Sequence, residues 1–512
     1  MAENLASFKV FCQGGLNTSR DVLSQGETQP GSAVALINYE PAVTGGYRKI
    51  NGFSNDYGTV TGTGNVLGVC VANGINDGIL ACRTPSSGNN YLHYWDTATS
   101  AWVAVTTSGS PTMTGVTKVR FTKYNWSSPK VLLTDGINPA AIYNGTTYTQ
   151  ITHADAPTDP KYSAVFQNHM FLAGDPSEQT NLYFSAPYDE TDYSASSGAG
   201  VINVGFPIVA IKSFRDSLYV FGSNNIRKIV GNNISNFVLQ EVTDDLGCLA
   251  TDSVIEIGGD LLFLSQDGLR PVSGTDKIGD VNLETVSKDI QSIFTDIVFD
   301  IDLETLNAVV IRQKTQFRYF FGAADSQGVI GGFRQTPNGL QFEYSQMLGI
   351  TATCADSGYI GQNEFVIHGT QDGKVHRQER GNDFDGEDIF SVFQTPFFHM
   401  QDPEQRKVFY TVATYLRAEG DNEIVMSALY DYEDIDTLSP TNFTLTTTGA
   451  AAYYNEALYN STAIFDGNPA PVKRTNISGS GKSASFKFVT NDSNASHSIQ
   501  GLVITFGVGD RL

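Results

Sequence analysis

The stretch GDLLFLSQDG, Gly259–Gly268, decides the fold, because the same pattern recurs along the chain. A polar turn is followed by three to five apolar or aromatic residues and then by another turn. A continuous apolar run between turns is typical of a short strand that is buried on both faces. The other six instances are DGILACRT (from Asp77), PKVLLTDG (Pro129), NHMFLAGD (Asn168), DSLYVFGS (Asp216), TQFRYFFG (Thr315) and NEFVIHGTQDG (Asn363).

The spacing of these runs predicts a propeller. Their anchors follow one another at intervals of 39 to 56 residues, and they are Leu80, Val131, Met170, Leu218, Leu261, Phe317 and Phe365. A period of about 50 residues is that of a blade of four antiparallel strands. We therefore predict an all-β chain with a β-propeller-like domain of about six to eight blades over residues 61–380. The alternative is a generic array of β-sandwiches without rotational symmetry.

The composition supports a β protein and argues against tight binding of nucleic acid. The chain has 512 residues, long enough for two or three domains. Only 17% of the residues are charged, below the roughly 25% of an average soluble domain, whereas glycine reaches 50 residues. The net charge is −22, and the longest basic clusters are Tyr47–Lys49 and Val472–Arg474. A protein that binds phosphates tightly usually carries a basic stripe, which is missing from this sequence.

Three further segments flank or interrupt the predicted propeller. Residues 1–60 are broken by glycines and prolines, and we predict an N-terminal docking segment with short strands. Residues 381–387 are polar and acidic, which predicts a linker, and residues 388–512 alternate like the strands of a C-terminal β-sandwich or jelly roll. One helix is expected in SKDIQSIFTDI, where Ser287 would cap it and Ile290, Ile293, Phe294 and Ile297 would share one face.

No motif keeps both the spacing and the context that chemistry requires. Ser478–Ser485 ends like a phosphate-binding loop but lacks the first glycine and a following helix, and Gly62–Gly68 lacks the third glycine of a dinucleotide loop. The turns Ser265–Gly268 and Thr370–Gly373 lack the Thr-Trp that completes a sialidase Asp-box. The acidic stretches Asp383–Asp388 and Tyr430–Asp436 have no calcium-loop spacing. We predict no catalytic, cofactor-binding or metal-binding residue.

The histidines and cysteines are dispersed in the same way. A Ser-His-Asp triad stays open, because its members converge from distant positions, although no Gly-x-Ser-x-Gly elbow precedes a helix. The five cysteines contain no CxxC pair, which predicts buried free thiols and folding in a reducing cytoplasm. There is no signal-peptide pattern and no run of eighteen apolar residues, so no membrane insertion is expected. The histidines are His93, His153, His169, His368, His376, His399 and His497.

With these residues in view, the chain resembles the nozzle, or tail tubular (head–tail stabilisation), protein family of short-tailed bacteriophages. The opening GGLNTSRD, PGSAVALINYEP and GGYRKINGF, within Gly14–Phe53, is similar to the start of that family. Pro160–Ser194, the following IVAIKSFRDSLYVFGSNNIRKIVG and Leu246–Val272 resemble family blades in the family's order. FQTPFFHMQDPEQRKVFYTVATYLRAEGDNEIVMSALYDY resembles its C-terminal β domain.

The resemblance implies a structural role in a virion tail. It implies a homohexameric ring that extends the portal and adaptor channel, retains packaged DNA and conducts it during ejection. The partners would be other copies of the chain, the adaptor and portal-side tail proteins, and tail fibre or spike proteins. Duplex DNA would pass the acidic lumen without specific binding. The alternatives are a tail spike or glycan-binding β-propeller protein, and a soluble enzyme built on a propeller.

Overall fold

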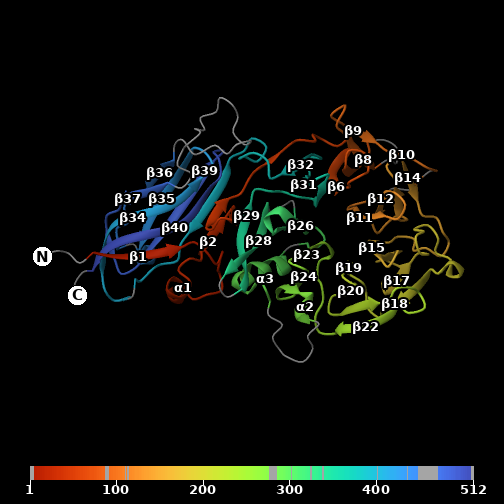
Figure 1. Cartoon of the computed structure of the whole chain (residues 1–512), viewed down its shortest axis with the longest axis horizontal. Helices are drawn as coiled ribbons and strands as arrows, with labels where there is room; N and C mark the ends of the chain where they lie inside the picture. Colours follow the sequence, from red (N-terminus) through yellow and green to blue (C-terminus); the bar gives the residue numbers. More distant parts are fainter. Residues whose placement is uncertain are drawn as a thin grey trace.

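The computed structural model describes residues 5–508 except 87–90, 110, 112–114, 276–284, 301, 323–325, 337–338, 401, 435 and 448–470. Strands dominate the described residues, as the composition predicted. Figure 1 shows two halves side by side, a ring of small sheets and a block of long strands that carries both chain ends. No helix in the described ranges is long and apolar enough to cross a membrane.

Six sheets belong to the ring alone, and each is antiparallel along most of its pairs. The first contains β6 (Thr63–Val71), β7 (Ile79–Thr84), β8 (Leu92–Asp96) and β9 (Ala101–Ala104), and the second β10 (Thr106–Thr107), β11 (Arg120–Asn125), β12 (Pro129–Thr134), β13 (Ala141–Tyr143) and β14 (Thr147–Gln150). The third contains β15 (Tyr162–Phe166), β16 (His169–Ala173), β17 (Asn181–Phe184) and β18 (Gly200–Asn203), and the fourth β19 (Ala210–Phe214), β20 (Ser217–Phe221), β21 (Ile226–Val230) and β22 (Val238–Thr243). The fifth contains β23 (Ile255–Ile257), β24 (Asp260–Ser265) and β25 (Gly268–Pro271), and the sixth β30 (Cys354–Ile360), β31 (Asn363–Gly369), β32 (Val375–Gln378) and β5 (Phe53–Ser54).

A seventh position in the ring is filled by the end of a much larger sheet. Strand β26 contacts both β23 and β30, and so lies between the fifth and sixth sheets. It begins a nine-stranded sheet whose order is β26 (Asn307–Ile311), β27 (Gln316–Phe320), β28 (Gln327–Thr336), β29 (Gly339–Leu348), β2 (Ala35–Ile37), β33 (Ile389–Gln394), β39 (Ala484–Asp492), β35 (Asn422–Tyr430) and β36 (Phe443–Thr447). The propeller-like prediction is confirmed, and the blade number falls within the predicted range.

The seven apolar runs of the sequence occupy equivalent places in this ring. Each anchor lies on the second strand of its sheet, in β7, β12, β16, β20, β24, β27 or β31. Six anchors have side chains without solvent exposure, and only Phe365 is partly exposed. A second strand has a neighbouring strand on each edge and a neighbouring sheet on each face, so it needs apolar residues at successive positions.

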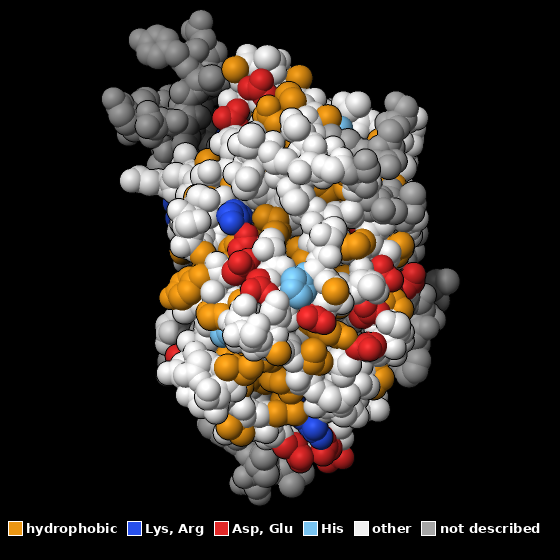
Figure 2. Space-filling view, turned by 90° about the vertical axis from the view of Figure 1, so that its right-hand side faces the viewer, with side chains coloured by type: hydrophobic (Ala, Val, Ile, Leu, Met, Phe, Trp, Pro, Cys, Tyr) orange, Lys and Arg blue, Asp and Glu red, His pale blue; other side chains and the backbone are white. Residues whose placement is uncertain are grey.

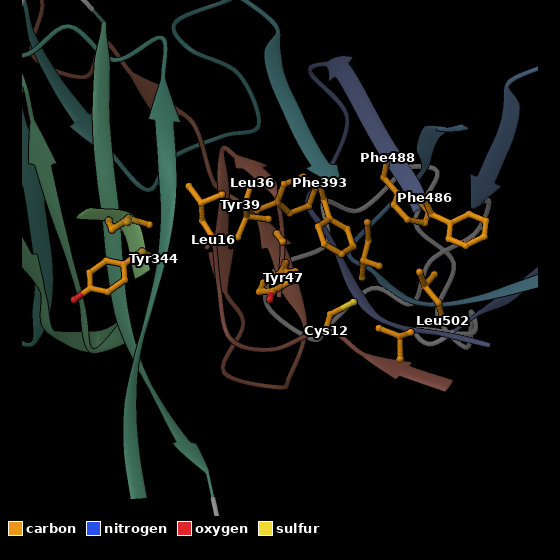
Figure 3. Packing of buried hydrophobic residues seen from close by; sticks show 14 of the residues in the cluster. Cys12, Leu16, Leu36, Tyr39, Tyr47, Tyr344, Phe393, Phe486, Phe488 and Leu502 are labelled. Atoms are coloured by element: carbon orange, nitrogen blue, oxygen red, sulfur yellow. The ribbon is translucent and has the colours of Figure 1, made fainter. Parts of the chain in front are cut away.

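The other half of the molecule is a sandwich of two sheets. Its second sheet has the order β3 (Tyr39–Pro41), β4 (Tyr47–Lys49), β40 (His497–Val508), β34 (Lys407–Ala418) and β37 (Val472–Asn476), with β1 (Leu5–Phe11) beside β40 and β38 (Ser480–Gly481) beside β34. Side chains of both sheets form one hydrophobic core. Figure 3 shows part of this core, where Tyr47, Phe393, Phe488 and Leu502 meet between the sheets.

The predicted separate C-terminal sandwich is not confirmed. Its strands share the nine-stranded sheet with β26–β29 of the ring, and β2 from the N-terminal segment lies between β29 and β33. Strands β1, β3 and β4 join the other sheet. The N-terminal segment therefore completes both sheets of its own chain, since the C-terminal strands alone leave these positions empty. The domain boundaries at residues 60, 380 and 388 stay a prediction.

The N-terminal segment also closes the ring. Strand β5 pairs with β32 as the last strand of the sixth sheet. Phe53 stacks on Phe384 with ring centroids 5.0 Å apart, so the predicted acidic linker is anchored by a buried aromatic side chain. A Cβ at Gly52 would lie 1.7 Å from the carbonyl oxygen of Asp383, which explains the glycine at this close approach.

The helices differ from the prediction in two respects. The expected helix exists as the 3₁₀ turn η3 (Lys288–Ile290) and α3 (Gln291–Asp300), and Ile290 and Phe294 are buried in the core. Ser287 does not cap it; its hydroxyl instead accepts a hydrogen bond from the Leu269 amide. The side chain of Ile297 lies outside the described residues. Further short helices, missed in the sequence, are α1 (Val22–Thr28), α2 (Val272–Thr275), η1 (Ala195–Ser197), η2 (Thr251–Ser253), η4 (Arg312–Lys314) and η5 (Asp431–Glu433).

Candidate functional site

A polar hollow lies on the axis of the ring. A cavity of about 510 Å³ is lined by residues of the first strand of each sheet, β6, β11, β15, β19, β23, β26 and β30, and of the turns before them. This volume is within the range of small-molecule sites. The lining combines aliphatic residues with charged ones, namely Lys118, Arg120, Lys123, Lys212, Asp252, Glu256 and Asp356.

At the end where the first strands begin, the charges are paired. Asp252 lies 2.7 Å from the Lys118 ammonium and accepts two hydrogen bonds from Arg120, at 2.8 and 3.0 Å. Burial raises the pKa of Asp252, but Arg120 and Lys118 together hold it well below its usual value. Glu304 lies 2.6 Å from Lys161 and closes the same group. These side chains hold the first strands of several sheets together.

At the other end the pairing is incomplete. Lys123 lies 2.8 Å from Asp356, whose carboxylate also accepts the Val71 amide at 2.8 Å. Lys212 is exposed inside the cavity, and no ion pair of it is found in the described part of the chain. Burial by the walls, and next the charge of Lys123, lower the pKa of Lys212. Glu256 and Asp356 line the same cavity and act in the opposite sense, although neither forms an ion pair with Lys212 among the described residues.

One serine–histidine contact resembles part of a catalytic triad. His153 Nε2 lies 3.1 Å from the Ser194 hydroxyl and 3.7 Å from an Asp192 oxygen. However, His153 Nδ1 accepts the Asp155 amide at 3.1 Å, so the neutral ring carries its proton on Nε2. A general base would need a free lone pair at Nε2 facing the serine. In this tautomer His153 donates a hydrogen bond to the loop and cannot activate Ser194.

The sequence motifs occupy structural turns. Two of them meet, because the Asp431 carboxylate of the acidic stretch accepts the amides of Lys482 and Ser483 in the Gly-Lys-Ser stretch, at 2.6 and 2.9 Å. Strand β39 follows that stretch, as its alternation predicted. The glycine-rich Gly62–Gly68 lies largely in β6. In the Asp-Gly turn Ser265–Gly268, Asp267 pairs with Arg270.

Two histidines, which flank the turn Thr370–Gly373, meet inside the sixth sheet. His368 and His376 face each other across β31 and β32, and their rings stack at 5.3 Å. Burial, followed by the charges of His376 and Arg318, lowers the pKa of His368 well below its usual value. Among the described residues no group of three or more His, Cys, Asp or Glu side chains could hold a metal ion. The turn length sets the register of a hairpin, and this register would have indicated from the sequence that the two histidines face each other.

A buried ion-pair network joins the ring to the sandwich. Arg318 of β27 has no solvent exposure, and it contacts Glu379 and lies 3.6 Å from Glu40 of β3. Glu40 lies 2.7 Å from Lys314 and 3.0 Å from Arg48. Arg48 also binds Glu419 at the end of β34, at 2.5 Å. Sequence reasoning missed this network because its members are hundreds of residues apart.

The cysteines are buried and free, as predicted. Burial raises the pKa of Cys12 and Cys354 to about 12 and that of Cys248 to about 11. Because the thiolate is the reactive form, we expect the native protein at pH 8 to react with a thiol reagent over hours, and the denatured protein to react at all five cysteines at once. Rapid labelling of even one cysteine in the native protein would contradict this.

Comparison with known proteins leaves the family open. No family model matches the chain, and no curated protein matches it. It is similar to the extracellular domain of a hybrid two-component system from B. thetaiotaomicron, at 12% identity and a TM-score of 0.40, over 65% of this chain and 40% of that chain. It is also similar to an exo-β-1,3-galactanase from Phanerochaete chrysosporium, at 9% identity and a TM-score of 0.24, over 89% and 100% of the two chains. Likenesses this low carry no argument about activity.

Proposed function

We propose that the chain is a structural subunit of a bacteriophage tail nozzle, a homohexameric ring that extends the portal and adaptor channel. It would retain packaged DNA and conduct it during ejection. The resemblance of Gly14–Phe53, Pro160–Ser194 and Leu246–Val272 to that family supports the proposal. Other copies of the chain, adaptor and portal-side proteins, and tail fibres or spikes would be its partners in the virion.

The observation that carries the proposal is the continuous nine-stranded sheet. It runs from β26 in the ring to β36 in the sandwich without a break in strand pairing. The buried network of Glu40, Arg318 and Glu379 fixes the same junction. A hinge between the halves would require these hydrogen bonds and ion pairs to open. A subunit that must hold its shape against pressurised DNA is expected to be stiff in this way.

The test of assembly is the mass of the particle in solution. We expect light scattering after gel filtration to give about six times the 55.4 kDa of one chain, at micromolar concentration or after mixing with adaptor protein. A stable trimer would favour a tail spike. A monomer at every concentration, with adaptor present, would contradict the ring.

The charge of the chain leads to a prediction about DNA. At a net charge of −22, we expect duplex DNA to bind more weakly than about 100 μM at physiological salt, since few cations can release phosphate counterions. An electrophoretic mobility assay over a salt series would measure this. Micromolar affinity that falls steeply with salt would identify a DNA-binding protein and overturn a passive channel.

A second candidate function, glycan binding by the propeller, is favoured by one surface feature. Tyr188 is 63% exposed with φ near +62°, and its ring meets Trp126 edge-on at 6.3 Å. An exposed aromatic side chain held in a strained loop is typical of recognition sites. At the end of the propeller farthest from the sandwich, Figure 2 shows hydrophobic and acidic side chains with few Lys or Arg.

Glycan binding is tested by substituting Tyr188. Glycan-array binding by the purified chain that is lost in Tyr188→Ala and kept in Tyr359→Ala, a partly exposed tyrosine of β30, would support this candidate. Equal array signals for the parent and the Tyr188→Ala variant would remove it, and would leave the nozzle proposal untouched.

A further inference from the structure

Two lysines lie at one end of the axial cavity of the ring. Lys123 on β11 and Lys212 on β19 line this end, and Arg312, directly after β26, lies outside the lining. Lys123 and Arg312 both act electrostatically on Lys212, as do the carboxylates Glu256 and Asp356. The charged side chains that line the cavity are four cations and three carboxylates, a net charge of +1 in a chain whose net charge is −22.

Two of the nearby carboxylates, Asp356 and Glu364, are already engaged, whereas Glu256 has no ion pair among the described residues. Asp356 accepts both the Lys123 ammonium and the Val71 amide. Glu364, the partner of Arg312, accepts the backbone amides of Arg312 and Gln313 at 2.7 and 2.9 Å, while its distance to the Arg312 guanidinium is 4.0 Å. Arg312 is half exposed, and Lys212 is exposed inside the cavity. Both can therefore donate to a further acceptor.

Hydroxyl groups also line the cavity. Thr122 on β11 and Ser163 on β15 lie 2.8 Å apart, and Ser213 follows Lys212 on β19. Ammonium, guanidinium and hydroxyl donors around a hollow of about 510 Å³ match an oxyanion with several acceptor oxygens. Val69 and Ile211 add apolar surface to the same wall.

We propose that the propeller axis is a binding site for a small oxyanion with two or more acidic oxygens, such as a phosphate or a polycarboxylate, and that Lys212 is its principal ligand. Lys123 and Arg312 add positive charge at the same end. The site is independent of the nozzle proposal, because it lies within one chain and needs no ring. A bound anion would also stabilise the propeller by joining the first strands of separate sheets.

Isothermal titration calorimetry with inorganic phosphate, and separately with citrate, tests the site. We expect saturable binding of at least one of them at one site per chain, weakened about tenfold or more in Lys212→Met and in Arg312→Gln. Lys9→Met, an exposed lysine on β1 of the sandwich, is the matched control and should bind like the parent. Circular dichroism would confirm that each variant is folded.

Thermal unfolding gives a second readout. The same anion should raise the unfolding temperature of the parent and of Lys9→Met but not that of Lys212→Met, at an ionic strength matched with sodium chloride. The proposal is overturned by an absence of saturable binding for both anions, by equal affinity in Lys212→Met, or by a thermal shift that sodium chloride reproduces.

Discussion

Replacing Arg318 by methionine is expected to lower the free energy of unfolding by about 3–5 kcal/mol. Arg318 has no solvent exposure, and it donates to Gln378 at 2.9 Å and to Gln316 at 3.2 Å besides contacting Glu379. Without the guanidinium, Glu40 and Glu379 stay buried with less opposite charge. Burial alone would raise the pKa of Glu379, but Lys314 and Arg318 hold it at about 2, so the carboxylate is charged in the native protein.

Urea unfolding followed by tryptophan fluorescence measures this change. Arg20→Met removes an exposed arginine near α1 and should change stability by less than about 0.5 kcal/mol. Adding Glu379→Gln to Arg318→Met should recover part of the loss, because the uncompensated carboxylate is then gone. A loss below 1 kcal/mol in Arg318→Met would show that the network does not hold the junction.

Acid is expected to destabilise the protein through His497, beginning below about pH 6.5. The Asn422 side-chain amide donates to Gly420, so its oxygen faces His497 Nδ1 at 3.2 Å and accepts the ring proton. The unprotonated Nε2 then accepts the Tyr39 hydroxyl at 2.9 Å. Burial, and next the charge of Lys49, lower the pKa of His497 to about 3.

The sign follows from linkage. Below about pH 6.5 the unfolded chain takes up a proton at this histidine and the native protein does not, so stability falls by up to about 1.4 kcal/mol per pH unit as the pH drops toward 3. In His497→Gln the free energy of unfolding should change less steeply with pH between pH 5 and 6.5, by an amount that corresponds to the uptake of about one proton. Carboxylates such as Glu379 act at lower pH, because their contribution is lost only below their unfolded pKa of about 4.3. If the free energy of unfolding had the same pH dependence in the parent and in His497→Gln, the burial of a neutral His497 would be contradicted.

The ring could be predicted because each of its sheets is local in sequence. Every sheet of the propeller except the sixth and the nine-stranded one is built from consecutive strands, and the nine-stranded sheet contributes the consecutive strands β26–β29, so an apolar second strand recurs at a regular interval. The anchors Leu80, Met170 and Leu261 show this directly, since each is fully buried in an equivalent strand. Turn residues such as Gly174, with φ near +79°, mark where the strands end.

The sandwich and the junction could not be predicted because their pairings are distant. Strand β2 pairs with β33, which lies more than 350 residues later in the chain. No local pattern in Ala35–Ile37 indicates that partner strand. The short α1 was missed because its cap Asp21 stands in a stretch punctuated by glycines. The cations of the axial cavity were missed for the same reason, because Lys123 and Lys212 line one cavity only once the ring closes.

The most direct test of the account is negative-stain imaging of the purified protein, alone and mixed with adaptor protein. The nozzle proposal predicts class averages of a closed ring with six-fold symmetry, a central hole wide enough for duplex DNA, and one propeller per subunit. Averages that show only single particles in both samples, or a compact trimer without a hole, would contradict it.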